Sequence, residues 1–599
     1  MLMIKKTFIY LILSVCHLSS YSSPSDWDGD LDPMPENYWN EIYSAHLLER
    51  AGFGGTPDDI KFFSSLTMRE AVDYLINYDL IEELLPKYKS SPNLDHGIDP
   101  FPPSRPAATN QAKAEGKAIG VLIKPDGNRR LQQVADRFLY WLRASRLETQ
   151  RYAYWWANRM LNTKKPLQEK MTLFWHGHFA TSEEKVRDYR KIIKQNQMFR
   201  EKSLSNFKDL LFSTAKDPAM LAYLDAAANV KGAPNENFAR EIMELFSMGV
   251  GNYTEHDIKE AARAFTGWNF NGTDFVFNKE KYDGGNKKFL DKSGNFDGEQ
   301  IIDIILEQEV TAEFLASKIY QYFVKEEISN DLKYKLGKFL RSNSYDIKKF
   351  LYLIFLSKDF YSTNSVSTRI KPPVELVINT YKKMGLFEIP GIPDFNEVTY
   401  SMGQKLFFPP NVAGWTTGRS WITPGLLITR SNFVFDTVFP SINFKSNDRV
   451  AGSQYQIGPV EELISMGMNI TTATKPQGKK ITSLSSQADR DEAFNTRFAS
   501  YRAWRKAIEK VIPIPRVTAQ INLSKLVIDS KCETTSDVVN YFVKRFISVQ
   551  IDTELKKKII LMLSEELGTS NISEAKTYME EALRNTLHVI LSLPAYQLG

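Results

Sequence analysis

The stretch Leu173-Phe174-Trp175-His176-Gly177-His178-Phe179 decides how the rest of this 599-residue chain is interpreted. Two of the seven histidines fall within three positions there, and aromatic residues flank them. The run that begins at Lys165-Pro166 has apolar residues at helical spacing, so a helix leads into the pair. Residues two apart on a helix point about 200° away from each other, so the two imidazoles can share a ligand only outside a helix.

Gly177 lies between the two histidines and is typical of a helix end. Thr181-Ser182-Glu183-Glu184 then has the pattern of a capping box, which starts a new helix. The sequence therefore predicts that His176 and His178 lie in the turn between two helices, where their rings converge.

A second polar run extends from Asn235 to Gly249, and it is predicted to be a helix. Glu236, Arg240 and Glu244 stand four apart and form a ladder of ion pairs, so we expect Arg240 to neutralise both glutamates. Glu241 lies on a neighbouring face and is the candidate free carboxylate. The same spacing also fits a solvated face without a function.

The composition indicates a globular protein. Hydrophobic residues make up 43% and aromatic residues 12% of the chain, which is enough for a large core in one elaborated domain or in several. The 76 basic and 71 acidic side chains nearly balance at a net charge of +5. This balance gives no argument for nucleic acid or an anionic membrane as a partner.

The first 23 residues are predicted to be a signal peptide, because Lys5 and Lys6 precede a short apolar run and then small polar residues. The alternative is an uncleaved anchor, and no later stretch resembles a transmembrane span. We expect an exported protein that is periplasmic, outer-membrane-associated or secreted. Cys16 ends a sequence similar to a lipobox, but Val15 stands where a smaller residue is usual, so a lipoprotein is the less favoured interpretation.

The predicted fold class is mainly α: a multi-helix globular array with one small antiparallel hairpin or ribbon near residues 268–290, around an Asn-Gly turn. A polar spacer at 24–37 precedes a main helical domain at 38–440. A polar insertion at 441–496 separates it from C-terminal helices at 497–599, which we expect to pack on the main domain. Removal of the signal peptide leaves Cys532 alone, which excludes an intrachain disulfide.

The stretch from Pro409 to Trp421 is rich in Pro, Gly and Trp and is predicted to be a defined loop. Asn411, Trp415 and Trp421 are candidate ligand-binding residues, because tryptophan rings stack on sugars and on aromatic ligands. The alternative is that the two tryptophans fill the core. Common cofactor and hydrolase signatures such as the Walker loop, His-Glu-x-x-His and Gly-x-Ser-x-Gly are absent from the sequence.

Five motifs occur in one order over most of the chain: His46 to Gly54, Pro166 to Ser182, Asn235 to Gly249, Thr266 to Trp268, and Pro409 to Trp415 with Trp421. In this combination the chain resembles the bacterial exported family called domain of unknown function 1800. The resemblance implies no assigned activity. It does imply a gene neighbourhood with exported sulfatase-like or phosphatase-like proteins, and hence polymer or surface chemistry. The chain departs from the family pattern at Tyr282, where histidine is frequent, and at Gly177, where asparagine is frequent.

Two hypotheses follow, and the first is an exported hydrolase that acts on an extracytoplasmic polymer or ester. Its site residues are His176, His178, Asn237, Arg240 and Glu241. In one version a divalent metal ion is held by His176, His178 and Glu241 and activates a water molecule. In a metal-free version a histidine is the general base and Arg240 binds an anionic substrate.

The second hypothesis is a non-catalytic envelope or secreted module that binds polysaccharide or a partner protein, such as an exported sulfatase-like protein. Trp175, Asn411, Trp415 and Trp421 are its candidate binding residues. The histidines, Glu241 and Arg240 then form a polar network that fixes helix packing. An open pocket beside them favours the enzyme, and a wall of aromatic side chains favours the module.

Overall fold

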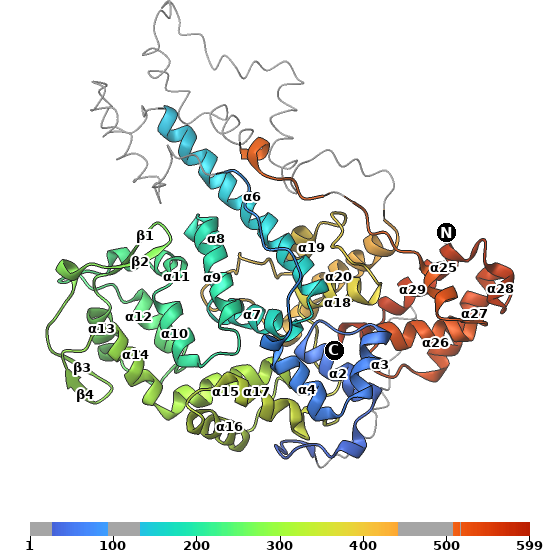
Figure 1. Cartoon of the computed structure of the whole chain (residues 1–599), viewed down its shortest axis with the longest axis horizontal. Helices are drawn as coiled ribbons and strands as arrows, with labels where there is room; N and C mark the ends of the chain where they lie inside the picture. The colour runs from blue at the N-terminus through green and yellow to red at the C-terminus, as the bar shows by residue number, and fades with distance from the viewer. Residues whose placement is uncertain (1–26, 94–131, 441–506, 516) are drawn as a thin grey trace, which may run out of the picture.

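The computed structural model describes residues 27–93, 132–440, 507–515 and 517–599, with side chains from residue 140 onward in the second range (Figure 1). The predicted signal peptide and the predicted polar insertion at 441–496 lie outside the described residues.

The fold is mainly helical, as the sequence predicts. The first half contains α2 (Glu41–Ala51), α3 (Pro57–Ser65), α4 (Met68–Ile76), α6 (Gln132–Asn162), α7 (Pro166–His178), α8 (Glu183–Val186), α9 (Tyr189–Glu201), α10 (Phe207–Ala215), α11 (Pro218–Tyr223), α12 (Asn237–Glu244) and α13 (Glu255–Ala264). The second half contains α14 (Gly298–Glu307), α15 (Glu309–Phe323), α16 (Asn330–Ser342), α17 (Ile347–Leu356), α18 (Pro373–Lys383), α19 (Phe395–Ser401), α20 (Pro424–Val438), α25 (Leu523–Asp529), α26 (Thr535–Phe546), α27 (Thr553–Leu567), α28 (Ile572–Ala575) and α29 (Met579–Leu591). Many of these helices begin at the side-chain caps that their sequences predict, including the capping boxes at Thr56 and Thr67.

The predicted β hairpin is present. Strands β1 (Trp268–Asn271) and β2 (Asp274–Phe277) pair antiparallel, and the turn between them contains Gly272 with a φ of 57°. A second two-stranded sheet follows, formed by β3 (Lys287–Phe289) and β4 (Lys292–Gly294). The sequence predicted a single hairpin or ribbon near residues 268–290, and the structure has two separate sheets. Capping residues of α13 hold this second sheet, because the Leu290 N–H donates to the Asp257 carboxylate at 2.9 Å.

The buried apolar side chains form two cores. The first is built mainly from α2–α4, α7 and α9–α17, and the second from α6, α18–α20 and the C-terminal helices α25–α29. Helix α7 contributes to both, since Trp175 packs in the first core and Leu173 in the second. Figure 1 shows the sheets and the C-terminal helices at opposite ends of the molecule, with α7 between them.

Segments outside the long helices pack against both cores. Residues 27–35, predicted to belong to a polar spacer, bury Trp27 and Met34, and the Met34 N–H donates to the Leu356 carbonyl at 2.8 Å. Among the C-terminal helices, α29 packs on α20 and α26 packs on α18. Within the described part of the chain, no helix is both long and apolar enough to span a membrane.

Candidate functional site

Helix α7 continues through both histidines, which corrects the predicted turn. Gly177 is helical and the helix ends only at His178. A new helix, α8, does begin here, but Ser182 caps it by accepting from the Glu184 N–H, and the predicted capping box from Thr181 to Glu184 does not form. Because both histidines are helical, their rings point in different directions and contact different parts of the molecule.

His176 is 1% exposed and serves as an acceptor for the backbone. Its Nε2 atom accepts a hydrogen bond of 3.0 Å from the Phe407 N–H, and its ring contacts those of Trp156, Phe407 and Trp415. Burial lowers the pKa of His176 to about 3, so the ring is neutral at physiological pH.

His178 is partly exposed, and its ring forms a hydrogen bond with the backbone at Phe246. Its Nε2 atom lies 3.0 Å from the Phe246 carbonyl oxygen, so this nitrogen carries the proton and donates. The rings of Phe174, Trp175, Phe179, Phe246 and Phe314 surround it. Burial, together with the nearby Lys318 charge, lowers the pKa of His178 to about 3.

The polar residues of α12 have a different arrangement from the predicted ladder. Arg240 pairs with Glu236 at 3.3 Å, but its second partner is Glu255, at 2.8 and 2.9 Å, rather than Glu244. Glu244 instead accepts from the Tyr253 hydroxyl at 2.7 Å. Arg240 is therefore occupied by two carboxylates within the protein.

Asn237 and Glu241 lie on the surface side of α12. Asn237 is exposed, and its backbone N–H donates to Asn235 Oδ1. Glu241 is partly buried, and among the described residues it makes no ion pair or hydrogen bond. Burial raises its pKa, the Glu244 charge raises it further, and Arg240 opposes both effects.

The proposed metal ligands do not form a metal site. Across the described residues no group of three or more His, Cys, Asp or Glu side chains could hold a metal ion. The histidines also use their Nε2 atoms for protein hydrogen bonds. The metal-binding prediction for His176, His178 and Glu241 thus lacks the converging donors that a metal ion requires.

The loop after α19 docks directly on the end of α7. Gly414 has a φ of 84°, and a Cβ atom added there would lie 2.4 Å from the Gly177 carbonyl oxygen. Asn411 shapes the same turn, because its Oδ1 accepts from the Ala413 N–H at 2.9 Å. The Trp415 ring contacts the His176 ring at 5.3 Å between centroids. Two of the sequence motifs therefore meet here.

The four predicted aromatic and amide binding residues divide into two groups. Trp175 is fully buried and donates its Nε1–H to the Ser203 carbonyl, and Trp421 is 3% exposed and packs on Gly403. Both fill the core. Asn411 is exposed and Trp415 is partly exposed, so these two reach the surface together.

Phe407 is a feature that the sequence did not indicate. It has a φ of 65°, which is strained for a bulky residue. His176 accepts its N–H, and its carbonyl oxygen accepts from the Glu183 N–H at 2.9 Å. His176 and the start of α8 thus hold the base of the loop in an unfavourable backbone conformation.

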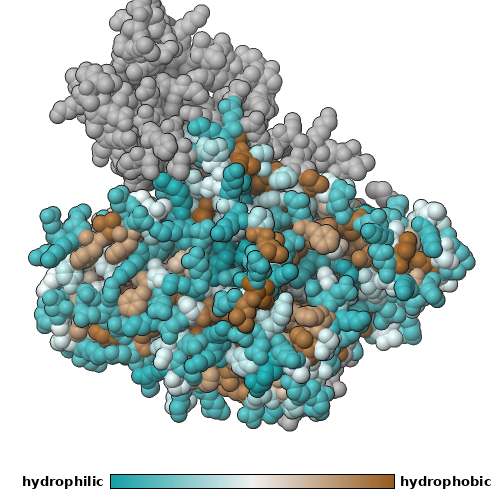
Figure 2. Space-filling model, in the orientation of Figure 1, coloured by the Kyte–Doolittle hydropathy of each residue, from teal (hydrophilic) through white to brown (hydrophobic). Residues whose placement is uncertain are grey.

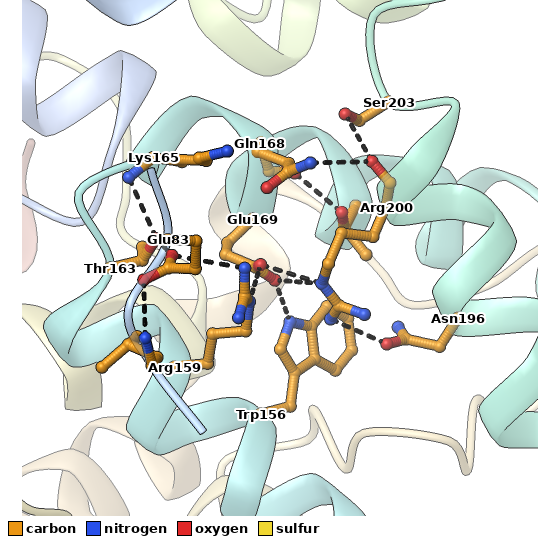
Figure 3. Close-up of polar contacts among 12 residues, drawn as sticks. Glu83, Trp156, Arg159, Thr163, Lys165, Gln168, Glu169, Asn196, Arg200 and Ser203 are labelled. Carbon is orange, nitrogen blue, oxygen red and sulfur yellow. Dashed lines mark hydrogen bonds and ion pairs between the residues drawn. The ribbon is translucent and has the colours of Figure 1, made fainter. Parts of the chain in front are cut away.

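A buried carboxylate also fixes the helices around α7, and it was not predicted. Glu169 accepts from Trp156 Nε1 at 2.7 Å, from Arg200 Nε at 2.8 Å, and from Arg159 Nε (Figure 3). Burial raises the pKa of Glu169, but the two guanidinium groups outweigh burial and hold it below its usual value. This network joins α6, α7 and α9 and leaves the Glu169 carboxylate enclosed.

A second charged network joins α2 to α18. Glu49 pairs with Lys371 at 3.1 Å and with Lys383 at 3.5 Å, and it accepts from Asn379 Nδ2 at 2.9 Å. All four side chains are buried. Sequence periodicity cannot reveal such pairs, because the partners lie more than 300 positions apart.

The comparisons agree with the sequence resemblance. No curated protein and no solved structure matched the chain. The family model described as protein of unknown function DUF1800 matches residues 46–598, nearly the whole chain, and the chain therefore belongs to this family.

Proposed function

We propose that this protein is a non-catalytic, exported binding module that holds a polysaccharide through the loop Pro409–Trp421. The observation that carries the proposal is the partial exposure of Trp415 on a fixed loop. Glycine and asparagine contacts fix this loop against α7. Exposed residues of the same loop segment are small or polar: Asn411, Ala413, Thr416, Thr417 and Arg419.

The orientation of the indole supports stacking on a sugar. Trp415 Nε1 is buried and has no hydrogen-bond partner among the residues that the structure describes, so any part of the ring that reaches solvent is carbon. The apolar face of a pyranose ring fits such a surface, and neighbouring hydroxyl and amide groups supply hydrogen bonds. The face of the molecule in Figure 2 is largely hydrophilic, with separate hydrophobic patches.

The hydrolase hypothesis has weaker support. A general base needs a lone pair within reach of the substrate. The Nε2 lone pair of His176 accepts from Phe407, and His178 keeps its lone pair on Nδ1, in a ring surrounded by aromatic side chains. Arg240, the proposed anion-binding residue, is taken by Glu236 and Glu255. Catalysis that uses His176 Nε2 or Arg240 would require these bonds to be replaced, so we place the hydrolase with His176, His178, Asn237, Arg240 and Glu241 second.

The proposal is tested by affinity electrophoresis and calorimetry of the full chain with soluble polysaccharides, beginning with dextran. Replacement of Trp415 by Ala should weaken binding about tenfold, since it removes the stacking ring. Trp415→Phe should retain part of the affinity, because it keeps an aromatic face but a smaller one than the indole. Phe387→Ala removes an 86% exposed ring elsewhere and serves as the control. Equal binding by Trp415→Ala and wild type would refute the proposal.

Export is a separate part of the proposal and rests on the first 23 residues of the sequence. Expression of the full chain in a bacterial host, followed by cell fractionation and N-terminal sequencing, tests it. A mature N-terminus after the small residues Ser19–Ser23 supports cleavage as a signal peptide, whereas a lipid-modified Cys16 would identify a lipoprotein. Recovery of the intact N-terminus in the cytoplasm would refute export.

A further inference from the structure

Two cations flank one aromatic ring at the base of the Pro409–Trp421 loop. The Lys405 ammonium lies 4.8 Å from the centre of the Phe408 ring, and the guanidinium carbon of Arg146 on α6 lies 5.7 Å from it. Lys405 also lies 5.1 Å from the ring of Tyr400, which is 60% exposed. The loop and α6 thus bring two positive charges and two aromatic rings together.

Within the described part of the chain, neither cation forms an ion pair with a carboxylate. Over the described ranges Lys405 and Arg146 make cation–π contacts but no ion pair or hydrogen bond. Lys405 is only 7% exposed. Other lysines of comparable burial have protein partners: Lys170 pairs with Glu375 at 2.7 Å, and Lys287 donates to the Asp283 and Gly285 carbonyls. The Lys405 ammonium is not among the fully buried atoms without a partner, so the side chain is mostly covered while its charged end reaches solvent beside the aromatic rings.

The electrostatics around Lys405 agree with its geometry. Burial lowers the pKa of Lys405 and Arg146 lowers it further, whereas the carboxylates of Glu397, Asp394 and Glu184 oppose these effects without forming an ion pair with Lys405. Arg146 and Lys405 therefore repel each other beside the Phe408 ring. An anion that contacts both groups would offset this repulsion and pair with both charges.

We propose that Lys405 and Arg146 recognise the acidic groups of the polysaccharide, so that the ligand of this loop is a glycan carrying carboxylate or sulfate groups. The inference rests on the proposed function, because Phe408 precedes the loop that carries Trp415. Phe408 and Tyr400 provide a surface beside the charges on which a sugar ring stacks. A nucleic acid fits less well, since its binding requires a longer row of phosphate contacts than two cations provide.

The test compares dextran with dextran sulfate, which share a backbone and differ in the acidic group, at low and at physiological salt. The wild-type chain should bind dextran sulfate at least about tenfold more tightly than dextran, as two charge-assisted contacts would allow. The double variant Lys405→Met and Arg146→Met keeps the alkyl packing on Phe408 and should reduce binding of dextran sulfate to the level of dextran. Polygalacturonate, as a second probe, distinguishes carboxylate from sulfate recognition.

The matched control is the double variant Lys61→Met and Lys338→Met, which removes the same charge from two exposed lysines. It should bind dextran sulfate like the wild type, and an equal loss in both double variants would overturn the inference. Equal affinity for dextran and dextran sulfate would also overturn it. So would competition by single-stranded DNA at the same concentration of charge.

The outcomes separate this inference from the proposed function. If Trp415→Ala abolishes binding of dextran while sulfate adds no affinity, the loop binds glycans and the acidic preference is refuted. If Trp415→Ala changes nothing while Lys405→Met and Arg146→Met abolish binding of dextran sulfate, the acidic site stands and the role of the loop is refuted.

Discussion

Replacement of Glu49 by Gln should strongly destabilise the protein, because it removes the carboxylate that pairs with two buried lysines. Lys371 and Lys383 lie 3.1 and 3.5 Å from Glu49, and their side chains are 3% and 6% exposed. Removing one partner from a buried ion pair leaves an uncompensated charge and costs about 3–5 kcal/mol. The amide retains only the hydrogen bond with Asn379, so we expect a loss in this range at pH 7.

The destabilisation should depend on pH. Burial lowers the pKa of Lys371 to about 8, and the Glu49 charge partly opposes burial. Loss of Glu49 lowers the folded-state pKa of Lys371 further, so folding of the variant favours the neutral amine more strongly. As pH rises through about 8, Lys371 becomes neutral in both folded proteins and no longer needs a counter-charge. The difference in free energy of unfolding should therefore narrow between pH 7 and pH 9.

Urea unfolding followed by tryptophan fluorescence measures this effect. The two cores predict more than one transition, so each is fitted separately. Glu41→Gln is the matched control, because it breaks an exposed pair with Lys544 and should cost about 1 kcal/mol or less. The double variant Glu49→Gln and Lys371→Met should recover part of the loss. A loss in Glu49→Gln no larger than in the control, or no recovery in the double variant, would refute the reasoning.

Three further predictions concern the loop and its support. Gly414→Ala should displace the loop and weaken dextran binding in calorimetry, because the added Cβ meets the carbonyl at the end of α7, whereas Gly425→Ala meets no atom within 4 Å and should bind normally. Glu183→Gln should flatten the loss of thermal stability between about pH 5 and pH 8, because burial raises the pKa of Glu183 to about 8 and the stability given by its protonated form is lost as pH rises from the unfolded pKa to that value. His176→Phe should cost about 1–3 kcal/mol in urea unfolding, since the Phe407 N–H loses its acceptor.

Local signals in the sequence predicted the helices well, and the failures occur where tertiary contacts override them. From the sequence, Gly177 is predicted to end a helix, but in the structure it lies within α7. Its lack of a side chain instead allows close packing, with Trp415 3.9 Å from the position of a Cβ and Gly414 against its carbonyl oxygen. A glycine within a helix costs about 1 kcal/mol relative to alanine, which packing of this kind can offset.

The predicted ion-pair ladder on α12 failed for a related reason. The spacing correctly predicted the ion pair between Arg240 and Glu236. It could not predict partners on the next helix. Glu255 offers both carboxylate oxygens to Arg240, and Tyr253 satisfies Glu244. Spacing within one helix therefore identifies candidate partners, and the neighbouring helix decides among them.

The position of the binding loop follows from the position of α7. This helix packs in both cores, and the buried carboxylate of Glu169 fixes it to α6 and α9. In the last turn of α7, His176 accepts a hydrogen bond from the strained backbone of Phe407. Gly414 of the loop packs against the Gly177 carbonyl oxygen in the same turn. Because His176 is buried and neutral, it holds the loop without titrating at physiological pH. Under the proposed function, the most distinctive motif of the sequence supports binding by the neighbouring Trp415, and that role requires neither a metal ion nor an exposed base.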